Sequence, residues 1–143
     1  MGALTILPPL VLSAGQLRVL TQPHTAQRAA DWIEETLRPG SRITRLWREY
    51  PVLNGNRFAL SLFEDPFGIE GKPSPPLDAD LVIVDDFPLI PFRPELLSDL
   101  RQDYRLAAVF HQPPRLGPFA IPEPRAPHDW KYTHPVLSLY LRR

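Results

Sequence analysis

Two histidines and two aspartates carry the side chains best suited to chemistry in this 143-residue chain: His24, Asp85, Asp86 and His111. Each follows a segment that we predict to be a β-strand. Because ligands of α/β proteins bind where parallel strands end, these side chains are candidates for a shared site. Two imidazoles and two carboxylates suit a divalent metal ion or an acid–base pair, with Asp86 or His111 as the base or metal ligand. The alternative is that the aspartates cap a turn and the histidines are solvated loop residues.

Motifs for other kinds of chemistry are missing from the sequence. The chain has no cysteine, which excludes a disulfide framework, a zinc–thiolate site and a thiol nucleophile. Its Gly71-Lys72 pair is followed by Pro73 where a phosphate-binding loop requires Ser or Thr. A second group of possible ligands, His128, Asp129 and His134, does not have the spacing of a helical ligand pair. We therefore expect no cofactor.

Apolar patterns predict the elements that would position these side chains. Apolar residues from Ala26 to Leu37 recur at helical spacing, so we expect a helix there, with Thr25 as its cap. A second helix is predicted to start at Pro94, with Leu96, Leu97, Leu100 and Tyr104 as its apolar stripe. The predicted strands cover residues 17–21, 80–84, 106–110 and 136–141. The unbroken apolar runs 81–84 and 106–110 predict strands that are buried on both faces.

Asn54-Gly55-Asn56 is typical of a tight turn and predicts a β-hairpin. The arms of this hairpin would be Arg42–Leu53 and Arg57–Phe63, and the second arm alternates well. Pro51 cannot donate a backbone hydrogen bond, so we expect the first arm to lie at a sheet edge or to contain a bulge.

Together these elements predict an α/β (or α+β) fold in a single domain covering residues 1–143. We expect a mixed β-sheet with one hairpin, one parallel β-α-β crossover, two main helices and a long proline-rich loop near the carboxyl end. The segment from Asp80 to Pro114, with its strand, acidic loop, helix and strand, is similar in outline to the amino-terminal halves of two-domain glycosyltransferases. That resemblance implies a Rossmann-like ligand-binding domain and concerns the fold alone.

Proline is the most unusual feature of the composition, with 19 residues, six of them between residues 111 and 130. Proline restricts the unfolded chain, so such a segment loses less entropy when it docks on a partner. Rigid backbone alternating with large apolar side chains suits an interface. The candidate partner-binding residues are Pro113, Pro114, Phe119, Ile121, Trp130 and Tyr132. The segment is either a docking arm or a loop that closes the domain's own core, and Trp47 and Tyr50 would extend the docking surface or belong to the core.

Charge and hydropathy narrow the choice of partners. The 16 basic and 16 acidic residues balance, which argues against a nucleic-acid partner. The apolar run from Ala3 to Leu12 contains Pro8-Pro9 and is too short to cross a bilayer, so we expect no membrane partner and a cytoplasmic protein, or part of a particle assembled there.

Two functions remain. The favoured one is a non-catalytic interaction or assembly subunit of a larger complex, cellular or viral, that docks on other protein subunits or on copies of itself through the proline-rich arm and an edge strand. The alternative is a small Rossmann-like enzyme domain that binds a ligand or metal at the carboxyl ends of the strands, using His24, Asp85, Asp86 and His111.

Overall fold

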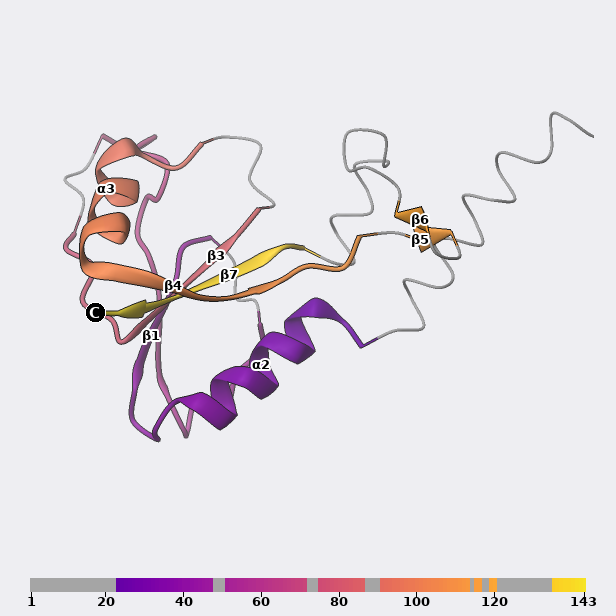
Figure 1. Cartoon of the computed structure of the whole chain (residues 1–143). Helices are drawn as coiled ribbons and strands as arrows, with labels where there is room; N and C mark the ends of the chain where they lie inside the picture. The colour runs from indigo at the N-terminus through magenta and orange to yellow at the C-terminus, as the bar shows by residue number, and fades with distance from the viewer. Residues whose placement is uncertain are drawn as a thin grey trace, which may run out of the picture.

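A five-stranded mixed sheet with one helix on each face forms the centre of the protein (Figure 1). The computed structural model describes residues 23–47, 51–71, 75–86, 91–113, 115–116, 119–120 and 135–143. The helices are α2 (Thr25–Thr36) and α3 (Pro94–Asp103), and the strand order is β2-β1-β3-β7-β4. The strands are β1 (Arg42–Arg45), β2 (Ala59–Leu62), β3 (Leu81–Asp85), β4 (Tyr104–Phe110) and β7 (Leu137–Arg142). The predicted α/β class, with a mixed sheet and two main helices, is confirmed, whereas the strand predicted at residues 17–21 lies outside the described residues.

Helix α2 forms where the apolar periodicity predicts it, but its cap is different. Ala26, Ala29 and Ile33 are buried against the sheet, as expected for one face of an amphipathic helix. The cap is His24, whose Nδ1 accepts a hydrogen bond from the amide of Ala26 at 3.1 Å. Thr25 was expected in that role. Thr25 is instead the first residue of the helix and is buried, and its hydroxyl donates a hydrogen bond to the carbonyl of Pro135.

The predicted hairpin around Asn54-Gly55-Asn56 is wrong, because β1 and β2 are parallel and Arg42 pairs with Ala59. The turn itself forms, with the amide of Arg57 donating to the Asn54 carbonyl. The reason lies in the connection between the two strands. Its described residues 51–58 bury Leu53 in the core on the α2 side of the sheet and return the chain to the starting end of β1. A hydrogen bond from the Gly40 amide to the Arg57 carbonyl, 2.7 Å long, marks that return.

The predicted edge position of the segment 42–53 is also wrong. Among its described residues, 42–47 and 51–53, the strand is β1, which lies inside the sheet between β2 and β3. The edges are β2 and β4. Pro51 lies outside the ladder, in the buried part of the connection, so its missing amide donor costs the sheet nothing.

The predicted β-α-β crossover is present as β3, α3 and β4, but the final strand β7 is inserted between the two parallel strands. It pairs antiparallel with both β3 and β4. This position makes β3 an interior strand that is buried on both faces and turns β4 into an edge strand. Burial of 106–110 on both faces was therefore a wrong prediction, since Leu106 and Val109 are half-exposed.

The spacing predicts that Tyr104 belongs to the apolar stripe of the second helix. This prediction is wrong, because Tyr104 is the first residue of β4. Its ring is buried in the core on the α3 side of the sheet. Its hydroxyl accepts a hydrogen bond from the Ala79 amide at 3.2 Å and donates one to the Ala79 carbonyl at 3.0 Å. The helix ends at Asp103 because the backbone at Tyr104 is extended.

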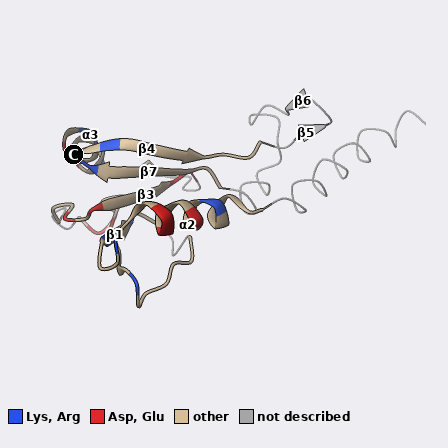
Figure 2. Ribbon diagram, turned by 60° about the horizontal axis from the view of Figure 1, so that its bottom comes forward, with Lys and Arg blue, Asp and Glu red and all other residues tan. Residues whose placement is uncertain are grey.

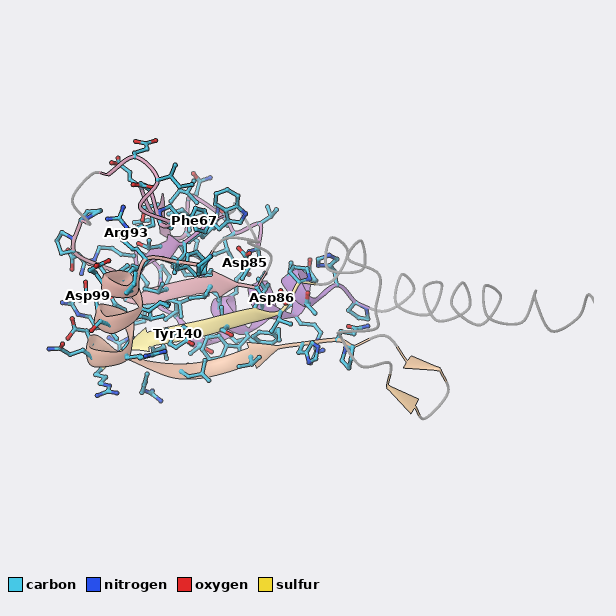
Figure 3. All side chains as sticks on the ribbon, turned by 90° about the horizontal axis from the view of Figure 1, so that it is seen from above. Phe67, Asp85, Asp86, Arg93, Asp99 and Tyr140 are labelled. Carbon is cyan, nitrogen blue, oxygen red and sulfur yellow. The ribbon has the colours of Figure 1, made fainter. Side chains whose placement is uncertain are left out.

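The two faces of the sheet are covered to different extents. Helix α2 packs along one face on residues of β1, β3 and β7, among them Ile43, Ile83 and Leu139. On the opposite face α3 packs with Leu96 and Leu100 over one end of the sheet, beside the end of β7. Figure 3, which views this face, shows no helix among the described residues over the other ends of β3, β7 and β4. Within the described part of the chain, neither helix has the length and hydropathy to span a membrane.

Candidate functional site

The two aspartates of the predicted site lie at the carboxyl end of β3 (Figure 3). Asp85 is the last residue of the strand and is buried, and its backbone pairs with Leu137. Asp86 extends the pairing of β3 with β7 by one residue beyond the strand. Its amide donates to the Val136 carbonyl at 3.1 Å, and its Oδ1 accepts from the Val136 amide at 2.8 Å. The carboxylate of Asp86 therefore joins the end of β3 to the beginning of β7.

His24 lies at the amino end of α2, near the start of β7. The next residue, Thr25, donates its hydroxyl to the carbonyl of Pro135 at 2.9 Å, which ties the helix to β7. Burial lowers the pKa of the His24 imidazole below its ordinary value of about 6.5. The low pKa agrees with its role in the helix cap, because a protonated Nδ1 cannot accept the hydrogen bond from Ala26.

His111 follows the last residue of β4 directly and is exposed. Because β3 and β4 run in the same direction, Asp85, Asp86 and His111 share one end of the sheet, as predicted. Over the described ranges, however, no group of three or more His, Asp or Glu side chains could hold a metal ion. The structure assigns capping contacts to His24 and Asp86, and a catalytic or metal-binding role for the four residues stays a prediction.

Most of the predicted partner-binding residues lie outside the described residues: Pro114, Ile121, Trp130 and Tyr132. Pro113 is described and half-buried. Phe119 belongs to β6 (Phe119–Ala120), which pairs antiparallel with β5 (Arg115–Leu116). Whether the proline-rich segment is an arm or closes the core stays open as a prediction, and so does the role of Tyr50.

Strand β4 gives the described molecule an open apolar edge. Leu106 and Val109 have 52% and 50% of their surface exposed. In a regular strand, residues three apart point to opposite faces, but the register shifts between Leu106 and Ala108. Leu106 then pairs with Tyr140 and Val109 with Ser138, so both exposed side chains lie on the same face of the sheet, opposite to α2.

Charge is scarce along this edge. Arg105 is the single charged residue of β4, next to the end that adjoins α3, and the rest of the strand is apolar (Figure 2). Proteins usually protect edge strands with lysines, prolines or bulges that prevent pairing with other chains. Here the bulge serves instead to gather two apolar side chains on one face.

The opposite flank, beside β2, is fixed by a buried ion pair between the loop after β2 and the start of α3. The Asp65 carboxylate and the Arg93 guanidinium lie 2.8 Å apart, with 5% and 9% of their side chains exposed. Asp65 has a φ of 46°, and its carboxylate also accepts hydrogen bonds from the amides of Ile69 and Glu70. The sequence Asp65-Pro66-Phe67-Gly68, with proline at its second position, is typical of a turn. This turn forms, with a hydrogen bond from the Gly68 amide to the Asp65 carbonyl.

This loop forms one wall of a cleft of about 610 Å³. Trp47, two residues after β1, meets Phe67 edge-to-face with ring centroids 4.6 Å apart, and Phe67 stacks on Phe92 at 5.3 Å. Glu64 and Glu70 line the same cleft. Its walls are therefore aromatic and acidic.

Sequence reasoning missed this cleft, although it considered Trp47 and the turn at Asp65 separately. The buried partner of Asp65 comes from Arg93, 28 residues away, and only the proline that follows Arg93 marks its position before a helix. No pattern of spacing connects these two residues. Comparisons with models of protein families, with curated proteins and with solved structures give no match for this chain.

Proposed function

We propose that this protein is a non-catalytic interaction or assembly subunit that docks on other protein subunits, or on copies of itself, through strand β4 and the proline-rich segment that follows it. The observation that carries the proposal is the open apolar edge at β4, where Leu106 and Val109 are half-exposed on one face.

The backbone of β4 suits pairing with an added strand. β7 occupies one side of β4, and the strand order leaves the other side at the end of the sheet. An extended segment that pairs there would form main-chain hydrogen bonds, which supply affinity in β-strand addition. Its side chains would contact Leu106 and Val109, and apolar cross-strand pairs of this kind stabilise a sheet.

The chain continues from this edge directly into the proline-rich segment, since Phe110 ends β4 and Pro113 follows three residues later. A partner strand on β4 would therefore lie beside the start of that segment. One continuous surface would combine strand pairing with a stiff apolar strip, and the near-neutral charge of the chain does not oppose its contact with another copy.

The decisive experiment replaces both exposed side chains, in the double variant Leu106→Lys/Val109→Lys. Native mass spectrometry of the full chain, purified from its natural source and compared with the variant, measures what stays attached. We expect the wild type to form a complex and the double variant to lose it. Val52→Lys is the control, because Val52 is also an exposed apolar residue, with 83% of its surface exposed, but lies in the connection before β2. Unchanged assembly by the double variant would contradict the proposal.

Deletion of residues 112–130 tests the proline-rich segment separately. A docking arm predicts loss of the complex with the melting temperature of the monomer retained. A loop that closes the core predicts a strong fall in that melting temperature, and in that case the docking role would be confined to β4.

A further inference from the structure

The ionisable side chains that line the cleft beside β2 are all acidic. Among the described residues that line it, the ionisable side chains are Glu64, Asp65 and Glu70, and no lysine, arginine or histidine is present. Asp65 is paired with Arg93. Glu64 is exposed, and within the described part of the chain its side chain forms no ion pair. The cleft is therefore complementary to a cation.

The aromatic wall selects among cations. Trp47 keeps 38% of its surface exposed while Phe67 holds it in place, and Phe67 is held in turn by Phe92. An indole ring is the best aromatic partner for an organic cation. A guanidinium group is flat and weakly hydrated, stacks on aromatic rings and pairs with a carboxylate through two hydrogen bonds, whereas an ammonium group is compact and strongly hydrated.

Apolar side chains extend the cleft beyond the charged part. Leu62, at the end of the edge strand β2, and Ile69, in the opposite loop, are both exposed at its margin. They offer contact to the aliphatic stem of a long side chain and to its neighbours in an extended chain. A bare metal ion would use none of this apolar surface.

The walls are also preorganised, which lowers the entropy lost on binding. The loop of residues 64–70 is fixed by the buried Asp65–Arg93 pair and by the hydrogen bonds from Ile69 and Glu70 to the Asp65 carboxylate. Gly68 has a φ of 73°, and a Cβ atom at this position would lie 3.6 Å from Nε of the Arg93 guanidinium.

We propose that this cleft binds the arginine side chain of an extended segment of a partner protein, with the guanidinium against Trp47 and Glu64 and the aliphatic stem along Leu62 and Ile69. The site lies on the opposite flank of the sheet from β4 and does not depend on docking there.

The test is a titration of the ¹⁵N-labelled full chain with an acetylated, amidated pentapeptide that has one central arginine between alanines and valines. The comparison peptide has citrulline in place of arginine, which keeps the shape and removes the charge. The indole N–H signal of Trp47, assigned with Trp47→Phe, is the readout. We expect the arginine peptide to shift this signal and to bind about tenfold more tightly than the citrulline peptide. Equal binding of the two peptides, or no shift at millimolar peptide, would overturn the proposal.

Variants locate the site. We expect Glu64→Gln to weaken the arginine peptide about fivefold. Glu35→Gln, which removes another exposed glutamate, from α2, should leave binding unchanged. If both variants weakened binding equally, the attraction would come from overall charge and the proposal would fail.

The variant Leu106→Lys/Val109→Lys should bind the peptide as the wild type does, so failure of this site and failure of docking at β4 are separable. Thermal melts of every variant establish that each one is folded.

Discussion

The two flanks of the sheet are held by different kinds of contact. Beside β2, a buried ion pair between Asp65 and Arg93 joins two segments 28 residues apart. At the start of β7, the strand next to β4, single hydrogen bonds to the backbone join the elements: the Thr25 hydroxyl donates to the Pro135 carbonyl, and the Val136 amide donates to the Asp86 carboxylate. The first flank carries a cleft lined by acidic side chains. On the second, the described residues leave Leu106 and Val109 of β4 half-exposed.

The two flanks of this small sheet therefore offer two different surfaces, one beside β2 and one beside β4. A buried charge must keep its partner, so the flank beside β2 is expected to tolerate little change in its loop. The half-exposed apolar side chains of β4 are expected to contribute little to the stability of the monomer, so that edge should tolerate substitution. The following four predictions test this contrast, from the largest expected effect to the smallest.

Arg93→Met should have the largest effect on stability. It leaves the Asp65 carboxylate buried without its guanidinium, and breaking a buried pair in this way costs about 3–5 kcal/mol. Urea unfolding followed by circular dichroism measures the loss. Arg142→Met is the matched control, because Arg142 pairs with Asp78 on the exposed surface and should change stability little. Equal effects of the two variants would contradict the contrast between the flanks.

Thr25→Val should lower the unfolding free energy by about 1–3 kcal/mol. Valine keeps the shape of the buried side chain but leaves the Pro135 carbonyl without its donor. Thr36→Val, at the exposed end of the same helix, should have little effect. If the two valine variants matched in urea unfolding, the hydrogen bond would not hold the flank beside β4.

The stability of the same flank should depend on pH through His24. Its pKa is lowered in the folded protein, so the unfolded chain binds the proton more readily. The stabilisation is therefore complete above the ordinary imidazole pKa of about 6.5 and is lost as the pH falls below it. His24→Asn keeps a capping side chain that does not titrate in this range, so its unfolding free energy should fall less between pH 7.5 and 5.5. An identical fall in both proteins would refute the assignment.

Leu106→Lys/Val109→Lys should have the smallest effect on the monomer, about 1 kcal/mol or less, because both side chains are already half-exposed. The melting temperature of the monomer, measured at low concentration beside Val52→Lys, tests this. A large loss would show that the edge is part of the core.

Local features of the fold could be predicted from the sequence. The stripe from Ala26 to Ile33 predicts α2, and the run from Leu81 to Val84 predicts a buried strand, because each pattern reflects burial along a single element. The turns at Asp65 and at Asn54 form as expected, since the backbone preferences of their residues act locally.

The partners of these elements could not be predicted in the same way. A turn like the one at Asn54 is compatible with two antiparallel strands joined in a hairpin. In this protein it instead ends a connection between the parallel strands β1 and β2. Likewise, the apolar run of β4 is compatible with a central strand and with an edge strand. The candidate site divides in the same manner: Asp85, Asp86 and His111 share a sheet end, as predicted, while the cleft at Trp47 comes from segments that no spacing relates.

Amino-acid order alone thus determined which segments become helix, strand or turn, because these choices depend on neighbours along the chain. The tertiary structure decided that β7 enters between β3 and β4, that β4 becomes the edge, and that Asp65 meets Arg93. These outcomes depend on which apolar faces and buried charges pack together across long separations, and that competition is settled only when the whole chain is folded.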